Sequence, residues 1–234
     1  MNEDVAMHLT IANQLYSSWS MRPWLVLHAF DIPFTQTVIG LRRTDSAERI
    51  SAVSPTGLVP VLEDGEAKVW EALAIIQYLA DAFPDRAIWP RDRALKGAAL
   101  SVSTEMAGGF GALRATCPMN LTKIFERPTL SEAAERDLDR ISTLICHARA
   151  NAPAGEGPFL FGAFCGADAM YAPICSRIDT YQLAVPAEVS EYIAAVRGHS
   201  SFKAWETEAA AETDRLSAYE EGFTVARVLI PDPS

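Results

Sequence analysis

The chain has 234 residues, of which 49% are hydrophobic and 21% charged, and its formal net charge at pH 7 is −10. This length and hydrophobic content can bury a substantial core in one large domain or two smaller ones, and they exclude a disordered or fibrous chain. The acidic balance argues against nucleic-acid binding through a broad basic surface, because that mode needs many Lys and Arg side chains to replace phosphate counterions.

The first predicted elements are a strand and a helix joined by a serine-rich loop. Polar and apolar side chains alternate over residues 8–13, and some of them are β-branched, which predicts a strand. Over residues 24–30, apolar residues recur at helical spacing, which predicts a helix. The loop between them reads Tyr-Ser-Ser-Trp-Ser-Met-Arg over residues 16–22, so it ends in the first turn of the helix.

This helix start is a candidate site for an anionic group. Unpaired N–H groups and the positive end of the helix dipole meet there, which favours an anionic sulfur, oxygen or carboxylate, and Arg22 adds a full positive charge. In the alternative interpretation, Ser17, Ser18 or Ser20 only caps the helix.

The following predicted elements are strands, and one contains a proline. Residues 34–39 alternate as a second strand, which completes a β-α-β unit, and a weak helix over residues 47–52 follows. Pro60 lies within the apolar run 58–62, where a proline is normally confined to a sheet edge or a bulge, so we expect a constrained turn or a cis bond. An Asp-Gly turn then predicts a hairpin into a strand over residues 67–70.

A helix beginning at Glu71 closes the first half of the chain, and its apolar stripe continues to Pro84. Glu71 either complements the helix dipole or accepts a hydrogen bond from the ammonium group of a ligand. Pro84 and Pro90 bound a segment that precedes helical sequence, so we expect the domain junction there.

The hydrophobic pattern of the second half predicts helices and no strand. The chain is therefore expected to form an α/β domain followed by an all-α domain. The expected helices cover residues 91–109, 130–150, 168–181, 186–197 and 200–211. The expected domains are residues 1–83 and 91–234, with a linker at residues 84–90.

Cysteine usage and hydropathy favour a reducing, cytoplasmic setting. The four cysteines show no C-x-x-C pair and no metal-ligand spacing with a histidine, so we expect buried thiols rather than disulfides or a metal site. No apolar run reaches the roughly 18 residues of a membrane span, and the N-terminus lacks the basic start of a secretory signal. We therefore expect a cytoplasmic protein with neither a membrane nor a nucleic acid as its partner.

In their order and spacing, four sequence features together resemble those of the cytosolic glutathione S-transferases. The resemblance covers essentially the whole chain up to about Glu220. The four features are the serine loop at residues 17–22, the Ser-Pro-Thr-Gly-Leu-Val-Pro-Val-Leu segment at 54–62, the helix start at 70–79, and Ala-Asp-Ala-Met at 167–170. The serine loop is most similar to the Ser-Ser-Cys-x-x-Arg signature of the zeta class, with Trp19 in place of the cysteine.

The resemblance implies a thioredoxin-like domain that binds glutathione as co-substrate, followed by a C-terminal helical bundle that lines the electrophile pocket. It implies that Ser17 or Ser18, with Arg22, activates the glutathione thiol. Ser17 matches the catalytic serine of the zeta class. The spacing between serine and arginine in other serine classes, counted back from Arg22, indicates Ser18 instead. With no cysteine before Cys117, the first half has no thiol for disulfide exchange.

Carried over by position, the resemblance also implies a set of glutathione contacts. Val59, before Pro60, would pair its backbone with the cysteinyl part, and Glu71 and Ala72 would meet the γ-glutamyl group. The full expected set is Trp19, Leu58, Val59, Pro60, Glu71 and Ala72.

Two residues depart from the family pattern. Ala72 stands where most relatives have Ser or Thr, so one side-chain hydrogen bond to glutathione is missing, which weakens binding by about 1 kcal/mol. Cys165 stands where an N-cap Ser or Thr usually precedes Asp168, so we expect an incomplete capping box in which Asp168 acts mainly through the helix dipole.

The second substrate is expected between the two halves. The candidate lining residues are Glu105, Met106, Phe110, Arg114, Met119 and Asn120. A proline interrupts the helix here among charged, sulfur and amide side chains, which indicates either a pocket for an acidic or aromatic electrophile or an ordinary helix break packed on the core.

Three functions stay open on the sequence: a transferase that conjugates glutathione to a small electrophile, a glutathione-dependent cis-trans isomerase of maleyl-type acids, and a non-catalytic interaction module of the same fold. The resemblance also implies a homodimer paired along the helix from Glu71 and the helix over residues 91–109. Small residues recur on the latter at helical spacing, which allows a partner helix to approach closely, although they would equally suit the interior of the chain's own bundle.

Overall fold

The computed structural model describes residues 7–153 and 155–233. The first half contains a four-stranded sheet with the strand order β2-β1-β3-β4. Its elements are β1 (Met7–Ala12), α1 (Ser18–Ala29), β2 (Phe34–Ile39), α2 (Ser46–Val53), β3 (Val61–Asp64), β4 (Ala67–Trp70) and α3 (Ala72–Ala82). β1 and β2 are parallel, with Leu9 opposite Gln36, whereas β3 is antiparallel to both β1 and β4. The predicted β-α-β unit and hairpin are confirmed.

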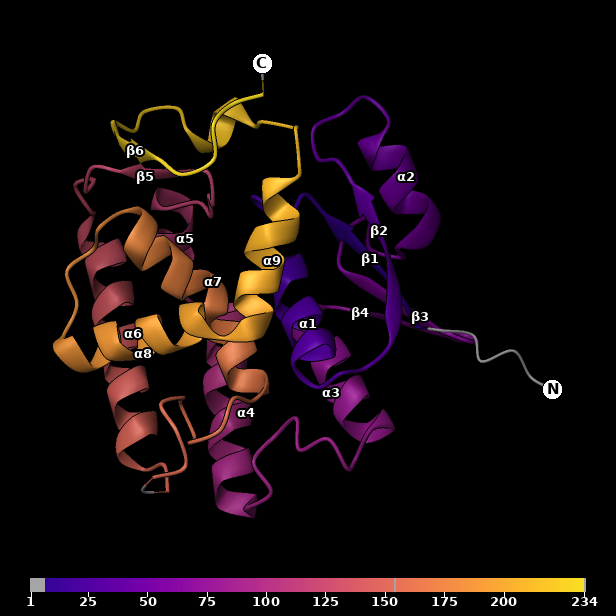
Figure 1. Cartoon of the computed structure of the whole chain (residues 1–234), viewed down its shortest axis with the longest axis vertical. Coiled ribbons are helices and arrows are strands. Elements are labelled where there is room, and N and C mark those ends of the chain that lie inside the picture. Colours follow the sequence, from indigo (N-terminus) through magenta and orange to yellow (C-terminus); the bar gives the residue numbers. More distant parts are fainter. Residues whose placement is uncertain (1–6, 154, 234) are drawn as a thin grey trace.

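The second half is mostly helical (Figure 1). Its helices are α4 (Arg93–Gly108), α5 (Gly111–Thr116), α6 (Glu132–Ala150), α7 (Gly166–Thr180), α8 (Ala187–Gly198) and α9 (Ser200–Ala210), and a 3-10 turn, η1 (Ser217–Tyr219), follows. Segment 83–92 connects α3 to α4. The division into two domains with a linker at residues 84–90 stays a prediction.

A common core joins the two halves. In Figure 1, α1 lies between the sheet and the helical part, and it contacts both α7 and α9. The buried rings of Trp24 on α1 and Trp205 on α9 meet edge to face with their centroids 5.2 Å apart. At the start of α7, Gly166 donates its N–H to the carbonyl of Ile88 at 2.8 Å. A Cβ on Gly166 would lie 2.8 Å from the ring of Trp89, so this approach of the linker requires glycine.

The prediction that the second half has no strand is wrong. β5 (Lys123–Phe125) and β6 (Val225–Val228) form an antiparallel pair of strands that joins the C-terminal segment to the chain after α5. Strands of three or four residues are too short for alternation to distinguish them from loops, and their partners lie about a hundred residues apart.

The expectation of an incomplete capping box at α7 is also wrong. Cys165 and Asp168 form a capping box in which the thiol takes the place of the usual hydroxyl. The Asp168 carboxylate accepts hydrogen bonds from the N–H of Cys165 at 2.9 Å, the N–H of Leu160 at 3.0 Å and the hydroxyl of Tyr192 at 3.1 Å. Asp168 therefore acts through direct hydrogen bonds and not mainly through the dipole.

All four cysteines are free thiols; Cys117, Cys165 and Cys175 are buried, as expected, whereas Cys146 is half-buried. Among the described residues, no helix is both long and apolar enough to cross a membrane.

Candidate active site

Two adjoining cavities lie beside the serine loop, and Trp19, Leu58 and Val59 line both of them. The Glu71 cavity has a volume of about 350 Å³ and is lined by Trp19, Thr56, Leu58, Val59, Pro60, Trp70, Glu71, Ala72 and Ala107. The Ser18 cavity has a volume of about 460 Å³. Its lining comes from both halves and includes Tyr16, Ser17, Ser18, Trp19, Arg42, Arg114, Met119, Arg177, Ala218 and Tyr219. Together these cavities can hold an extended ligand and a second molecule next to it.

The structure distinguishes the two candidate serines. Ser17 is the N-cap of α1: its Oγ accepts from the N–H of Ser20 at 3.4 Å and donates to the Oγ of Ser20 at 2.7 Å. The Ser20 Oγ accepts a further bond from the N–H of Ala12 at 3.0 Å, which ties the helix start to β1. The capping alternative therefore describes Ser17, whose hydrogen already has an acceptor.

Ser18 is the first residue of α1 and faces the Ser18 cavity. Its Oγ accepts a hydrogen bond from Nη2 of Arg177 at 3.3 Å. Within residues 7–153 and 155–233, no acceptor is present for the hydrogen of this hydroxyl. The Ser18 hydroxyl can therefore donate to an anionic group in the cavity.

Arg22 lies behind the serine loop and lines neither cavity. Its side chain is fully buried, donates from Nε to the carbonyl of Met170 and from Nη1 to the carbonyl of Ser18, both at 3.0 Å, and lies 4.2 Å from the centre of the Trp19 ring. Burial, reinforced by the charges of Arg177 and Arg114, holds the pKa of Arg22 well below its usual value. Arg22 thus supports the loop from the side of α7, and its charge reaches the cavity only through space.

Arg177, Arg114 and Arg42 line the Ser18 cavity. Arg177 is buried, and its Nε donates to the carbonyl of Cys117 at 2.8 Å. Burial lowers the pKa of Arg177 to about 10, and the neighbouring charge of Arg114 contributes to this shift. Arg114 donates to the carbonyl of Met106 at 3.2 Å and lies 5.4 Å from the centre of the Trp19 ring.

None of these cationic side chains is neutralised within the part of the chain that the structure describes. The ion pairs found there involve neither Arg22, Arg42, Arg114 nor Arg177. Arg177 is buried without a counter-charge among the described residues, which is costly, so an anionic group in this cavity would be stabilised.

The Glu71 cavity presents backbone groups. The Val59–Pro60 bond is cis, which confirms that expectation. Across the described residues, neither the N–H nor the C=O of Val59 has a hydrogen-bond partner, so both can pair with an extended ligand. Glu71 has a φ of 68° and is exposed at the start of α3, while Ala72 is the first residue of that helix. The carboxylate of Glu71 and the N–H of Ala72 can meet an ammonium and a carboxylate group respectively.

The residues expected for the second substrate divide into two groups. Arg114 and Met119 line the Ser18 cavity. The other four line neither cavity: Met106 and Phe110 are buried in the core, Glu105 pairs with Arg140 at 2.7 Å, and Asn120 is buried with its Oδ1 bonded to Thr122.

Sequence reasoning missed Tyr16, Arg42, Arg177 and Tyr219 in the Ser18 cavity. Tyr16 could have been found, because it is the first residue of the serine-rich stretch 16–22. Arg177 lies inside a helix and Tyr219 beyond the last predicted helix, so neither carries a local signal.

Comparisons with known proteins agree with this architecture. Residues 16–82 match the family model for the glutathione S-transferase N-terminal domain. A 66-residue stretch is 38% identical to dichloromethane dehalogenase of Methylorubrum extorquens, covering 27% of this chain and 23% of that protein. A 104-residue stretch is 28% identical to a probable maleylacetoacetate isomerase of Caenorhabditis elegans, covering 42% and 48% of the two chains. The chain thus spans less than half the length of these curated relatives.

A solved structure shares the fold of both halves. It is a glutathione transferase homolog from Burkholderia gl BGR1 with bound glutathione, and it aligns with 88% of this chain and 100% of its own at a TM-score of 0.69 and 20% identity. The fold and the two cavities thus define a protein of the glutathione S-transferase fold. Residues 16–82 thus match the N-terminal domain of the glutathione S-transferases and the chain shares their fold, which confirms the resemblance and the expected fold class.

Proposed function

We propose that the protein is a glutathione transferase that joins the thiolate of glutathione to a small electrophile. The observation that carries this proposal is the Ser18 hydroxyl, whose hydrogen has no acceptor in the described chain and which faces a cavity continuous with Val59. Structures solved with glutathione among the fold's neighbours support the same co-substrate.

Glutathione fits the Glu71 cavity by its chemistry. The backbone of Val59 would pair with the cysteinyl residue, the Glu71 carboxylate would accept from the γ-glutamyl ammonium, and the Ala72 N–H would donate to the γ-glutamyl carboxylate. Leu58, Pro60 and the ring of Trp19 would enclose the peptide. In this arrangement the thiol lies towards Ser18 and the second substrate occupies the Ser18 cavity.

Activation of the thiol needs modest energy. A thiol with a pKa of about 8.5 becomes mostly ionised at neutral pH when its pKa falls by about two units, which corresponds to about 2.7 kcal/mol. A hydrogen bond from a hydroxyl to a charged acceptor contributes about 1.5–3 kcal/mol. The start of α1 and the charge of Arg177 at Ser18 add to it. Ser18 is therefore the proposed thiolate donor, while Ser17 and Arg22 hold the loop.

Replacing Ser18 by Ala is expected to raise the pKa of the bound glutathione thiol by about one to two units, because one hydrogen bond to the thiolate is lost. Ser17→Ala is expected instead to lower the free energy of unfolding by about 1 kcal/mol, through loss of the helix cap. The ultraviolet absorbance of the thiolate, recorded against pH, measures the pKa. Ser18→Thr, which keeps the hydroxyl, serves as the control, and an unchanged pKa in Ser18→Ala would rule out the assigned role.

The second candidate is a glutathione-dependent isomerase of maleyl-type acids. The specific observation in its favour is the set of arginines in the Ser18 cavity, which form no ion pair with a carboxylate of the described residues, since such a substrate carries carboxylates. A turnover screen over chloronitroaromatic and maleyl substrates separates transferase from isomerase. Calorimetric titration with glutathione separates both from a non-catalytic module, for which no heat of binding is expected.

A homodimer is also part of this proposal. On α4, Ala94, Gly97, Ala98 and Ser101 are exposed, whereas Val102 is buried in the chain's own core. These small exposed residues would allow a partner helix to approach closely. Sedimentation equilibrium at micromolar concentration is expected to give twice the 25.5 kDa of one chain. A mass of one chain would refute the dimer.

The free thiols, three of them buried, support a reducing compartment and therefore the cytoplasm as the proposed location.

A further inference from the structure

The C-terminal segment forms one side of the Ser18 cavity, about two hundred residues after the serine loop. Ala218 and Tyr219, from η1, belong to the lining. The ring of Tyr219 lies with its centroid 5.1 Å from that of Tyr16, and the guanidinium carbon of Arg42 lies 6.0 Å from its centre. Tyr219 therefore spans the space between the serine loop and the exposed rim formed by Arg42.

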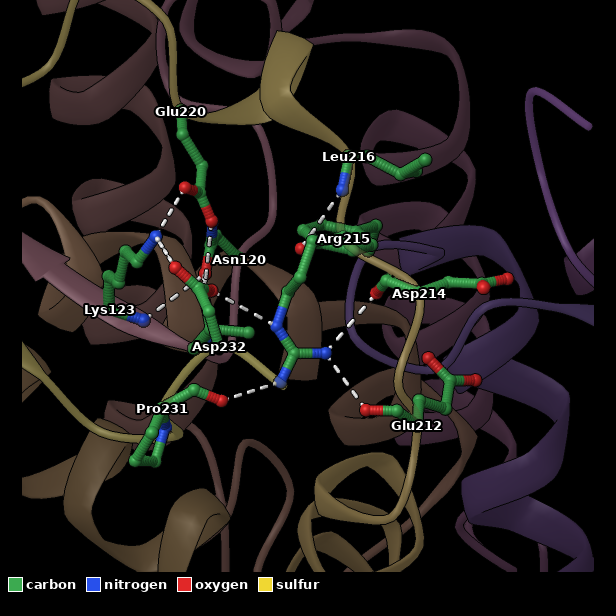
Figure 2. A network of polar contacts seen from close by, with 11 residues as sticks. Asn120, Lys123, Glu212, Asp214, Arg215, Leu216, Glu220, Pro231 and Asp232 are labelled. Atoms are coloured by element: carbon green, nitrogen blue, oxygen red, sulfur yellow. Dashed lines mark hydrogen bonds and ion pairs between the residues drawn. The ribbon is translucent and has the colours of Figure 1, made fainter. Parts of the chain in front are cut away.

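A buried ion pair holds one end of this segment. Lys123 on β5 pairs with Glu220, the residue after Tyr219, and lies 3.5 Å from Asp232 (Figure 2). The Lys123 side chain is only 10% exposed, so this pair is shielded from solvent. The Glu220 carboxylate also accepts from Thr122 at 3.3 Å.

A second set of contacts holds the other end. Arg215 donates to the carbonyl of Glu212 at 2.8 Å and to the carbonyl of Pro231 at 3.0 Å, and thereby ties together the beginning and the end of the segment (Figure 2). The N–H of Leu216 donates to the hydroxyl of Tyr16 at 3.3 Å. Contacts on both sides of η1 therefore fix the position of Tyr219.

Aromatic side chains also attach the C-terminal segment to the helical half. Phe223 lies 5.2 Å from Phe125 and 4.9 Å from Tyr181, measured between ring centroids. β6 adds backbone pairing with β5. These contacts hold segment 212–232 firmly against the rest of the fold, and we call this segment the C-terminal wall.

We propose that Tyr219, presented by the C-terminal wall, is a specificity-determining residue of the second-substrate cavity, and that it selects electrophiles with a planar conjugated group. This inference rests on the proposed function, because it assigns the Ser18 cavity to the electrophile. The half-buried Tyr219 lines the cavity, where a planar ligand can stack on its aromatic ring. The arginines at the same cavity suit an anionic substituent on that ligand.

The test compares Tyr219→Ala with Tyr219→Phe, and uses Leu229→Ala, an exposed position of the same wall, as the matched control. The first readout is binding of 8-anilinonaphthalene-1-sulfonate, a planar aromatic anion, which needs no glutathione. We expect Tyr219→Ala to weaken dye binding about tenfold, and Tyr219→Phe and Leu229→Ala to change it less than twofold. Equal affinity in wild type and Tyr219→Ala would overturn the proposal.

The second readout is turnover with glutathione. Tyr219→Ala is expected to raise the KM for 1-chloro-2,4-dinitrobenzene about tenfold, with the KM for the small electrophile iodoacetamide and the Kd of glutathione unchanged. A uniform change for both electrophiles would contradict a specificity role and show a structural one. Absence of glutathione binding in the wild type would refute the proposed function alone, because the dye measurement still decides the role of Tyr219.

Lys123→Met tests whether the wall must be held in place. Loss of the ion pair is expected to weaken dye binding at least fivefold, as in Tyr219→Ala. Arg140→Met, which breaks an exposed pair with Glu105, is the charge-matched control and is expected to leave dye binding unchanged. Dye binding by Lys123→Met equal to that of the wild type would show that the ion pair does not position Tyr219.

Discussion

Asp168→Ala is expected to lower the free energy of unfolding by about 3 kcal/mol at neutral pH. The substitution leaves the N–H groups of Leu160 and Cys165 and the hydroxyl of Tyr192 without their acceptor. Buried donors that lose a partner cost about 1–3 kcal/mol each, and the relieved burial of the Asp168 charge offsets part of that sum. Urea unfolding measures the change, with Asp139→Ala, at an exposed position of α6, as the control.

The same variant has a pH signature. Burial, which outweighs the hydrogen bonds from Leu160 and Cys165, raises the pKa of the Asp168 carboxyl from 3.8 to about 6. The folded state therefore holds this proton more tightly than the unfolded state, so the group's contribution to stability is largest at low pH and falls as the pH rises from about 4 to about 6. We expect the deficit of Asp168→Ala to be about 1 kcal/mol larger at pH 5 than at pH 7. A deficit independent of pH would contradict the raised pKa.

The thioredoxin-like half could be predicted from the sequence because its signals are local. Alternating side chains indicated the strands, and the position of Pro60 within an apolar run indicated a special turn. A carboxylate before an apolar stripe indicated the start of α3 at Glu71. Each of these features depends on residues within one element or its nearest turn. Val59, Glu71 and Ala72, to which these features drew attention, line one cavity.

The rest of the site depends on contacts between distant segments. Ser17 and Ser18 are adjacent in the sequence, yet Ser20 engages the hydroxyl of one and Arg177 the hydroxyl of the other. No period in the sequence reveals such a pairing across 159 residues. Similarly, Tyr219 reaches the cavity only because β5 and β6 pair and Lys123 holds Glu220.

The capping box shows a different limit of the sequence. The family pattern led us to treat Cys165 as a defect, since a thiol is a weak hydrogen-bond partner. The carboxylate of Asp168 nevertheless keeps its full set of donors, because these come from Leu160 and Tyr192 as well as from Cys165. Although the cap residue is Cys rather than Ser or Thr, the carboxylate of Asp168 at the third helical position keeps its hydrogen bonds.

Arg177→Met is expected to lower kcat/KM for a maleyl acid about 100-fold and for a neutral chloronitroaromatic less than tenfold. A fully desolvated charge pair loses about 2–5 kcal/mol when one partner is truncated, and about 2.7 kcal/mol corresponds to this 100-fold loss. Arg177 lines the Ser18 cavity and has no carboxylate partner among the described residues, so its charge is available to an anionic substrate. The neutral substrate loses only the support that Arg177 gives to Ser18.

Stability distinguishes this role from a structural one. Removal of Arg177 takes away a buried charge but leaves the carbonyl of Cys117 without its donor at 2.8 Å, so the two effects oppose each other and the free energy of unfolding is expected to change by less than about 2 kcal/mol. Arg136→Met, at an exposed position of α6, controls for the change in net charge. Equal losses for the acidic and the neutral substrate would show that Arg177 acts through Ser18 and not by binding an anion. A weakened Kd for glutathione would instead show that Arg177 holds a carboxylate of glutathione itself.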